Sequence, residues 1–198
     1  MIEVPLSLPR SAFSPREAAR AGDIWRAFQD VAVAGSAHAG WPPERYRREG
    51  VSFIVRAMVV RHRREARWGE AIVGRTWPSR IRRGTFFRRE VRLEAPAGRL
   101  AGATQEWVHV ATDPARGLRL TRGSDALQEA FAVEHPDDEP APLAAPRFEP
   151  RAAQTVHRFE LECWHGWMDP LGHVNHPAYI DWADEALCRI AAAAGLDP

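Results

Sequence analysis

The residue pattern changes from helical to β-rich between Gly40 and Val51, and this change limits the folds that the chain can adopt. Before Gly40, apolar and small residues recur at helical spacing, which predicts one long amphipathic helix over residues 15–39. Ser14, with Glu17 three residues later, has the pattern of a capping box at the start of this helix. The positions that define its buried stripe are Trp25, Phe28, Ala32, Gly35 and Ala39.

From Val51 the chain is rich in β-branched and aromatic residues, which favour strands. We predict a short strand over residues 3–8 and four further strands over residues 51–60, 71–77, 85–93 and 100–112. Residues 85–93 alternate, with Phe87 and Val91 on one face and Glu90 and Arg92 on the other. Residues 1–134 are therefore predicted as one α+β domain, an antiparallel sheet wrapped around a long central helix.

Residues 135–153 are rich in Pro, Ala and acidic residues, which is the composition of a linker. After it the opening pattern returns, with a predicted strand over residues 156–164 and a predicted helix over residues 177–194. The order of elements indicates that residues 154–198 begin a second repeat. The strands that would complete this repeat do not follow.

Charge is nearly balanced, with 27 basic and 26 acidic residues, and every basic residue is Arg. Arg clusters at residues 61–64, 80–83 and 88–89 fall in strands and turns, so we expect a solvated sheet face and no nucleic acid as partner. A less favoured interpretation is attraction of an anionic acyl carrier.

The sequence lacks the signals of membrane insertion, secretion and metal binding. No stretch has the length and hydropathy of a membrane span, and the N-terminus shows no secretion signal. Two Cys without ligand or redox spacing add to an expected cytoplasmic location. No metal or other cofactor is expected, because the His and Cys residues of the C-terminal third lack ligand spacing: His157, Cys163, His165, His173 and His176.

The segment before the second helix carries the chemistry. Pro177 suits a helix start with Asn175 or His176 near its cap, and exposed N–H groups at such a start can stabilise an oxyanion. Asp169 and His173 stand just before it. A carboxylate beside an oxyanion site suits acyl transfer to water, either as nucleophile or as general base.

The run Asp169-Pro170-x-Gly172-His173-Val174-Asn175, followed by Tyr179 and an acidic pair, resembles the signature of hotdog-fold thioesterases of the 4-hydroxybenzoyl-CoA thioesterase-like superfamily. Residues 1–134 resemble one complete hotdog domain. The tandem arrangement resembles the fatty acyl-ACP thioesterases, whose second domain holds the catalytic residues.

The resemblance implies a set of roles. Asp169 takes the position of the catalytic carboxylate, and His173, Asn175 and Glu185 match further catalytic positions, with backbone at Gly172 and Val174 near the oxyanion. Two departures leave the substrate branch open, since Leu171 stands where acyl-ACP enzymes have Asn, and Trp167 where some coenzyme A branches have Asp. Ser14 stands opposite Asp169 in the first repeat, which implies that the first domain lacks a catalytic carboxylate.

Structural alternatives stay open for each residue. Asp169 before Pro suits a turn, His173 suits a bond to backbone, and Asn175 suits a cap. Glu185 shares a polar helix face with Asp181. We expect the helical stripe on the opposite side to be core: Tyr179, Trp182, Ala186 and Ile190.

The predicted function is hydrolysis of an acyl thioester of acyl carrier protein or coenzyme A, without a cofactor. The alternative is a non-catalytic acyl-binding or regulatory hotdog protein. Since a hotdog pairs with a second one, we expect either a homo-oligomer or pairing within the chain. The missing strands of the second repeat lead us to expect that this sequence is part of a longer double-hotdog enzyme.

Overall fold

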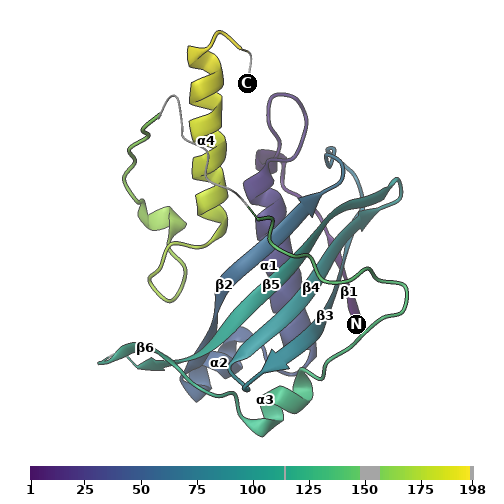
Figure 1. Ribbon diagram of the computed structural model, residues 1–198, viewed down its shortest axis with the longest axis vertical. Helices are drawn as coiled ribbons and strands as arrows, with labels where there is room; N and C mark the ends of the chain where they lie inside the picture. Colours follow the sequence, from purple (N-terminus) through teal and green to yellow (C-terminus); the bar gives the residue numbers. More distant parts are fainter. Residues whose placement is uncertain (114, 148–156, 197–198) are drawn as a thin grey trace.

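The computed structural model describes residues 1–113, 115–147 and 157–196. Residues 1–130 contain the strands and three of the helices, and α4 lies near the C-terminus (Figure 1). In chain order the elements are β1 (Ile2–Leu6), η1 (Arg10–Ala12), α1 (Ala21–His38), α2 (Pro43–Glu49), β2 (Val51–His62), β3 (Ile72–Arg82), β4 (Phe86–Ala95), β5 (Gly98–Asp113), β6 (Gly117–Leu120), α3 (Asp125–Ala130), η2 (His165–Trp167) and α4 (Pro177–Ala193).

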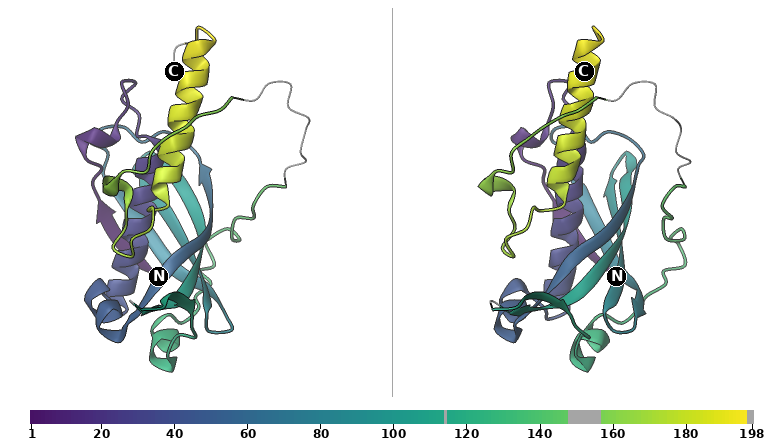
Figure 2. Two further views of the ribbon diagram at one scale, coloured as in Figure 1. Left: turned by 90° about the vertical axis from the view of Figure 1, so that its left-hand side faces the viewer. Right: turned by 60° about the vertical axis from the view of Figure 1, so that its left-hand side comes forward.

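The strands form one antiparallel sheet in the order β1-β3-β4-β5-β2, and β6 adds to the end of β5. The sheet curves around α1, which lies against its inner face (Figures 1 and 2). The five strands predicted within residues 3–112 are confirmed, although β3 runs to Arg82, five residues further than predicted, and the other ends shift by at most two residues. The short elements α2, α3 and β6 were not predicted, because four to seven residues give too little periodicity to read.

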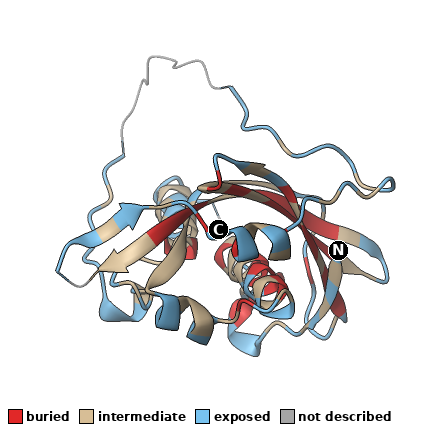
Figure 3. Ribbon diagram, turned by 90° about the horizontal axis from the view of Figure 1, so that it is seen from below, coloured by how far each residue is buried: buried red, intermediate tan, exposed pale blue. Residues whose placement is uncertain are grey.

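The core lies between α1 and the inner face of the sheet, where buried residues gather in Figure 3. Phe28 and Val31 are fully buried and pack on Val91 and Leu93 of β4. At Gly74 of β3 the helix approaches so closely that an added Cβ would lie 2.3 Å from Val31 Cγ2. A glycine is therefore required at this position for α1 to reach the sheet.

The predicted start of the first helix is wrong. The helix begins at Ala21, with Arg20 at the N-cap and no side-chain cap. Residues 14–19 form a turn instead, in which the Glu17 N–H donates to the Ser14 carbonyl and Glu17 has a φ of 59°. The Glu17 carboxylate pairs with Arg10 rather than closing a capping box. Backbone bonds to the neighbouring loop, such as Ala19 N–H to the Ala66 carbonyl, outweigh the local helix signal.

The prediction of a solvated outer sheet face is also wrong for the centre of β4. Glu90 and Arg92 are buried there because residues 135–147 cross this face in an irregular path (Figure 1). Glu139 from that segment is 2% exposed and binds three guanidinium groups, those of Arg75 (3.0 Å), Arg92 (3.2 Å) and Arg99 (3.0 Å). The part of the expected linker that the structure describes is thus bound to the sheet through Glu139 and Leu143, while most of its residues are exposed.

The second part of the chain contributes mainly a helix. The prediction over residues 177–194 is confirmed by α4, which ends at Ala193 just before Gly195 with its φ of 72°. The predicted strand is not formed over residues 157–164, and Val156 lies outside the described residues. The expected core stripe of α4 is wrong as well, since Tyr179 is 57% exposed and Trp182, Ala186 and Ile190 are half-buried.

The helix α4 runs antiparallel to the first half of α1 and extends beyond the sheet (Figure 2). Asp181 binds the guanidinium of Arg26, while the ring of His176, five residues earlier, lies 6.2 Å from that of Trp25 and is tilted against it by 50°. No helix among the described residues has the length and hydropathy needed to cross a membrane.

Candidate active site

Residues 168–174 form a tight loop immediately before α4. The Asp169 N–H donates to the His173 carbonyl (2.7 Å), and the Gly172 N–H donates to the Asp169 carbonyl (3.0 Å). Gly172 has a φ of 75°, a conformation that favours glycine. The Asn175 N–H donates to the Trp167 carbonyl (2.7 Å), which ties both ends of the loop together. The loop is therefore a defined structure that fixes where Asp169 points.

The Asp169 carboxylate is held by its own loop. Its Oδ1 accepts hydrogen bonds from the N–H groups of Leu171 (2.8 Å) and His173 (3.1 Å). This is the turn that Asp favours before Pro, so the turn interpretation of Asp169 holds alongside any chemical role. Oδ2 accepts no hydrogen bond from the described residues. One carboxylate oxygen is thus positioned and the other is available.

The other predicted site residues are placed less favourably. His173 is exposed, and the Asn175 side chain makes no hydrogen bond to the described part of the chain. The expected side-chain cap by Asn175 or His176 is wrong, because no cap bond forms at the start of α4. Glu185 lies two turns along α4, where it pairs with Arg189 at 2.7 Å on an exposed face.

The backbone donors expected for an oxyanion are mostly engaged. The N–H groups of Gly172, His173 and Asn175 all donate within the loop. Among the described residues the N–H of Val174 has no acceptor, since Val174 pairs with Met168 through the flanking bonds. Val174 is therefore the donor of this set that remains free for a ligand.

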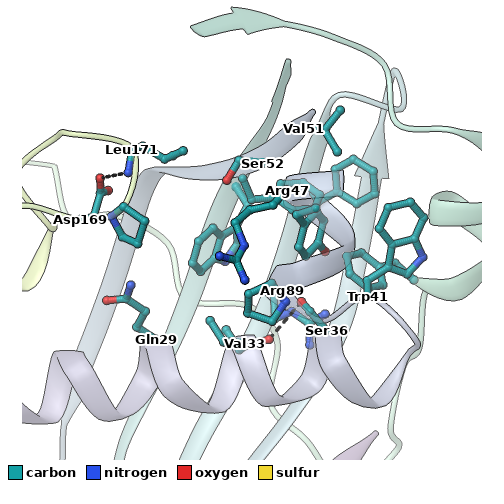
Figure 4. A pocket seen from close by; sticks show the side chains of 18 of the residues that line it. Gln29, Val33, Ser36, Trp41, Arg47, Val51, Ser52, Arg89, Asp169 and Leu171 are labelled. Atoms are coloured by element: carbon teal, nitrogen blue, oxygen red, sulfur yellow. Dashed lines mark hydrogen bonds between the residues drawn. The ribbon is translucent and has the colours of Figure 1, made fainter. Parts of the chain in front are cut away.

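An apolar cavity of about 540 Å³ opens next to Asp169. Its walls come from α1, α2 and the strands β2, β3, β4 and β5, with Trp41 and Phe131 from the adjoining loops, and Asp169, Pro170 and Leu171 line it at the loop before α4 (Figure 4). Asp169 and Gln29 lie at one end, and Ser36 and Trp41 lie toward the other. Its aromatic lining consists of Trp41, Tyr46, Phe53, Phe87, Trp107 and Phe131.

The loop reaches the cavity because α4 docks on α1. The guanidinium of Arg26 binds Asp181 on α4, and an added Cβ at Gly22 would lie 1.8 Å from Asp181 Oδ1. The missing side chain at Gly22 therefore allows the two helices to approach closely, and the ion pair between Arg26 and Asp181 joins them. This contact holds Asp169 against a cavity whose other walls lie at residues 29–131.

His176 anchors the same contact, although the sequence suggested for it only a cap or a metal ligand. Its ring lies between Trp25 of α1 and Trp107 of β5, and its Nε2 is buried without a hydrogen-bond partner among the described residues. Burial lowers the pKa of His176 from 6.5 to about 4, against the opposing effect of the Asp169 charge. The His176 ring is therefore neutral when α4 is docked on α1.

This burial predicts that acid weakens the docking. The neutral form of His176 stabilises the folded protein above its ordinary pKa, and this stabilisation is lost as the pH falls from 6.5 toward about 4. The loss amounts to at most about 1.4 kcal/mol per pH unit in this window. Asp23 and Asp184, whose pKa values burial raises, act in the opposite direction. Thermal unfolding followed by tryptophan fluorescence across this pH range measures the effect.

The variant His176→Gln separates this group from the other titrating groups. A side chain that stays neutral is expected to flatten the acid loss of stability, whereas His38→Gln at the exposed end of α1 leaves it unchanged. An unchanged acid loss in His176→Gln would assign the sensitivity to other residues.

Within the described residues no group of three or more His, Cys, Asp and Glu side chains is placed to bind a metal ion. No family model matches the sequence, and comparison with curated proteins finds no match either.

Solved structures match the fold over most of the chain. A 12:0-ACP thioesterase from Umbellularia californica has a TM-score of 0.71 at 17% identity, covering 94% of this chain and 74% of its own. An acyl-ACP thioesterase from Bacteroides thetaiotaomicron gives 0.70 at 16% identity, with 92% and 72% covered. A 4-hydroxybenzoyl CoA thioesterase gives 0.60 at 14% identity, with 66% and 98% covered. These likenesses confirm the predicted fold class.

Proposed function

We propose that this chain, which has the hotdog fold of the acyl-ACP thioesterases that it resembles, hydrolyses acyl thioesters. The observation that carries the proposal is the position of Asp169 at the end of an apolar cavity of about 540 Å³. A cavity of this size and lining suits an acyl chain. A carboxylate at its end suits attack on the thioester carbonyl.

The two oxygens of the Asp169 carboxylate have different roles in this proposal. Oδ1 is held by the Leu171 and His173 N–H groups, so that Oδ2 is the oxygen that accepts a proton from water. The activated water adds to the carbonyl carbon, and the C–S bond then breaks. The leaving sulfur takes up the proton from Oδ2, so that the carrier departs as a free thiol and the carboxylate is restored. The free N–H of Val174 is the donor that we assign to the carbonyl oxygen as it becomes negative.

The remaining predicted residues keep supporting roles in this proposal. His173 and Asn175 are close enough in sequence to Asp169 to orient water or the carrier once substrate is bound. Glu185, which pairs with Arg189 away from the cavity, takes no part in the proposed mechanism. The acyl carrier, coenzyme A or acyl carrier protein, then lies outside the cavity beside the exposed loop.

The experiment that tests the function is thiol release from two panels of thioesters, one of acyl-CoA and one of acyl-ACP, each varying only in chain length. Hydrolysis with a preference for one range of chain lengths is the expected result, because the apolar cavity has a limited volume of about 540 Å³. Absence of hydrolysis across the panel would contradict the proposal.

One observation favours the alternative of an acyl-binding protein without turnover. Of the predicted catalytic side chains only that of Asp169 lines the cavity, while His173 is exposed and Glu185 is paired elsewhere. This alternative predicts that acyl-CoA binds and quenches the fluorescence of Trp41 or Trp107 while no thiol is released.

A further inference from the structure

Arg89 is a buried cation without a carboxylate partner in the described part of the chain. It lies on the inner face of β4 among the residues that line the cavity, and it is 7% exposed (Figure 4). Its Nη1 donates one hydrogen bond, to the hydroxyl of Thr76 at 3.3 Å. Its other N–H groups have no acceptor among the described residues. A guanidinium has five N–H donors, so most of its capacity is unused.

The opposite face of the same strand shows how this protein treats an arginine that only supports the fold. Arg92, three residues later, is equally buried, but it binds the carboxylates of Glu90 and Glu139. Burying a charge without such partners is costly. Burial also lowers the pKa of Arg89 to about 10, against a smaller opposing effect of Tyr46, so the group stays charged at neutral pH. The unpaired nitrogens of Arg89 are not among the fully enclosed ones, and Arg89 lines the cavity, so these N–H groups are accessible from it. A guanidinium with free donors toward an apolar cavity points to an anionic ligand.

Residues of α1, of α2 and of the segment after α3 surround the Arg89 guanidinium and define its position. Gly35 of α1 leaves room for the guanidinium, because an added Cβ there would lie 2.5 Å from Nη1 of Arg89. The ring of Phe131 lies 5.2 Å from the guanidinium carbon and flanks it. The Tyr46 hydroxyl, which also belongs to the cavity lining, is buried without a partner among the described residues. Burial raises the pKa of Tyr46 to about 12, so this hydroxyl remains a donor.

We infer that the cavity selects an acyl group that carries a carboxylate at its far end, bound by Arg89 with the Tyr46 hydroxyl as a second donor. This inference rests on the proposed function, which places the thioester at Asp169. Gln29 beside Asp169 and Ser36 near Arg89 are seven residues apart on α1. Seven residues of helix span about 10 Å, which separates the two ends of a dicarboxylic acyl chain of medium length.

The test compares suberoyl-CoA with octanoyl-CoA, which have the same chain length and differ in the terminal carboxylate. Affinities are measured by calorimetry with Asp169→Asn, so that hydrolysis does not consume the ligand, and turnover is measured with the unmodified chain. Suberoyl-CoA is expected to bind about 10–100-fold more tightly, the range for hydrogen bonds to a charged group. Arg89→Met in the same background is expected to reverse the preference.

Matched variants separate recognition from folding. Arg80→Met removes an exposed arginine of β3 and is expected to leave the preference intact. Arg89→Met is expected to raise the melting temperature of the free protein, because it removes an unpaired buried charge. Tyr46→Phe is expected to reduce the preference by a smaller factor than Arg89→Met.

The outcomes distinguish this inference from the proposed function. Tighter binding of suberoyl-CoA without turnover of either thioester would support the carboxylate site and contradict the hydrolase. Turnover of octanoyl-CoA with equal or weaker binding of suberoyl-CoA would support the hydrolase and overturn the carboxylate site. A preference that survives in Arg89→Met would overturn it as well.

Discussion

Asp169→Asn is expected to lower kcat for thioester hydrolysis by about 10³–10⁴-fold, at the upper end of what a general base contributes. An asparagine side chain keeps an oxygen at the position of Oδ1, which still accepts from the Leu171 and His173 N–H groups. The loop therefore stays folded, while the proton acceptor at Oδ2 is lost. Thiol release under saturating substrate measures the effect.

The comparison with two further variants makes the interpretation specific. Asp169→Ala loses the turn bonds as well, so it is expected to lower both kcat and the affinity for substrate. Asp125→Asn, at an 88% exposed carboxylate, controls for the loss of one negative charge. Unchanged kcat in Asp169→Asn would remove Asp169 from the mechanism.

Glu139→Gln is expected to reduce the free energy of unfolding by about 3–5 kcal/mol, the usual effect of removing one partner from a buried ion pair. The carboxylate of Glu139 binds Arg75, Arg92 and Arg99, and both Glu139 and Arg92 are 2% exposed. A neutral amide leaves the buried Arg92 with Glu90 as its carboxylate partner among the described residues. Arg99 keeps Glu94, and Arg75 keeps the more exposed Glu3, Glu94 and Asp138. Urea unfolding followed by circular dichroism measures the loss.

The neighbouring residue supplies a matched control. Asp138 binds Arg75 at 3.3 Å, but its side chain is 67% exposed. Asp138→Asn is therefore expected to change the free energy of unfolding by less than about 1 kcal/mol. Equal effects of the two substitutions would mean that the network contributes no more than surface pairs do. Faster proteolysis within residues 135–147 is expected for Glu139→Gln only.

The long helix α1 and the strands β1 to β5 could be predicted because each carries its own local signal, whereas α2, α3 and β6 are too short to carry one. The stripe with Phe28 and Ala32 on α1 and the β-rich composition of the strands are local patterns that packing then confirms. The errors arose where distant segments meet. Glu90 and Arg92 look solvated on an alternating strand, and only the crossing of Glu139, far along the chain, makes their positions buried.

In the candidate site too, features formed by consecutive residues could be predicted, and features formed by distant residues could not. The loop of Asp169 and the helix that follows were recognisable as a motif, because the residues are consecutive. The residues that line the cavity were not, since Arg89 and Tyr46 come together only when β4 and α2 pack around α1. The buried state of His176 depends on Trp25 and Trp107, which are far from it in sequence. No local pattern encodes such a contact.

The docking of α4 on α1 has a kinetic consequence. The cavity is built within residues 29–131 and the carboxylate comes from residue 169, so only molecules with α4 docked hold both parts of the proposed site. The apparent affinity and the apparent rate are then proportional to the fraction of molecules in which α4 is docked. Weakening the Arg26–Asp181 contact lowers this fraction and therefore lowers both quantities. Chain-length preference stays constant under such a change, because the molecules that remain competent have an unaltered cavity.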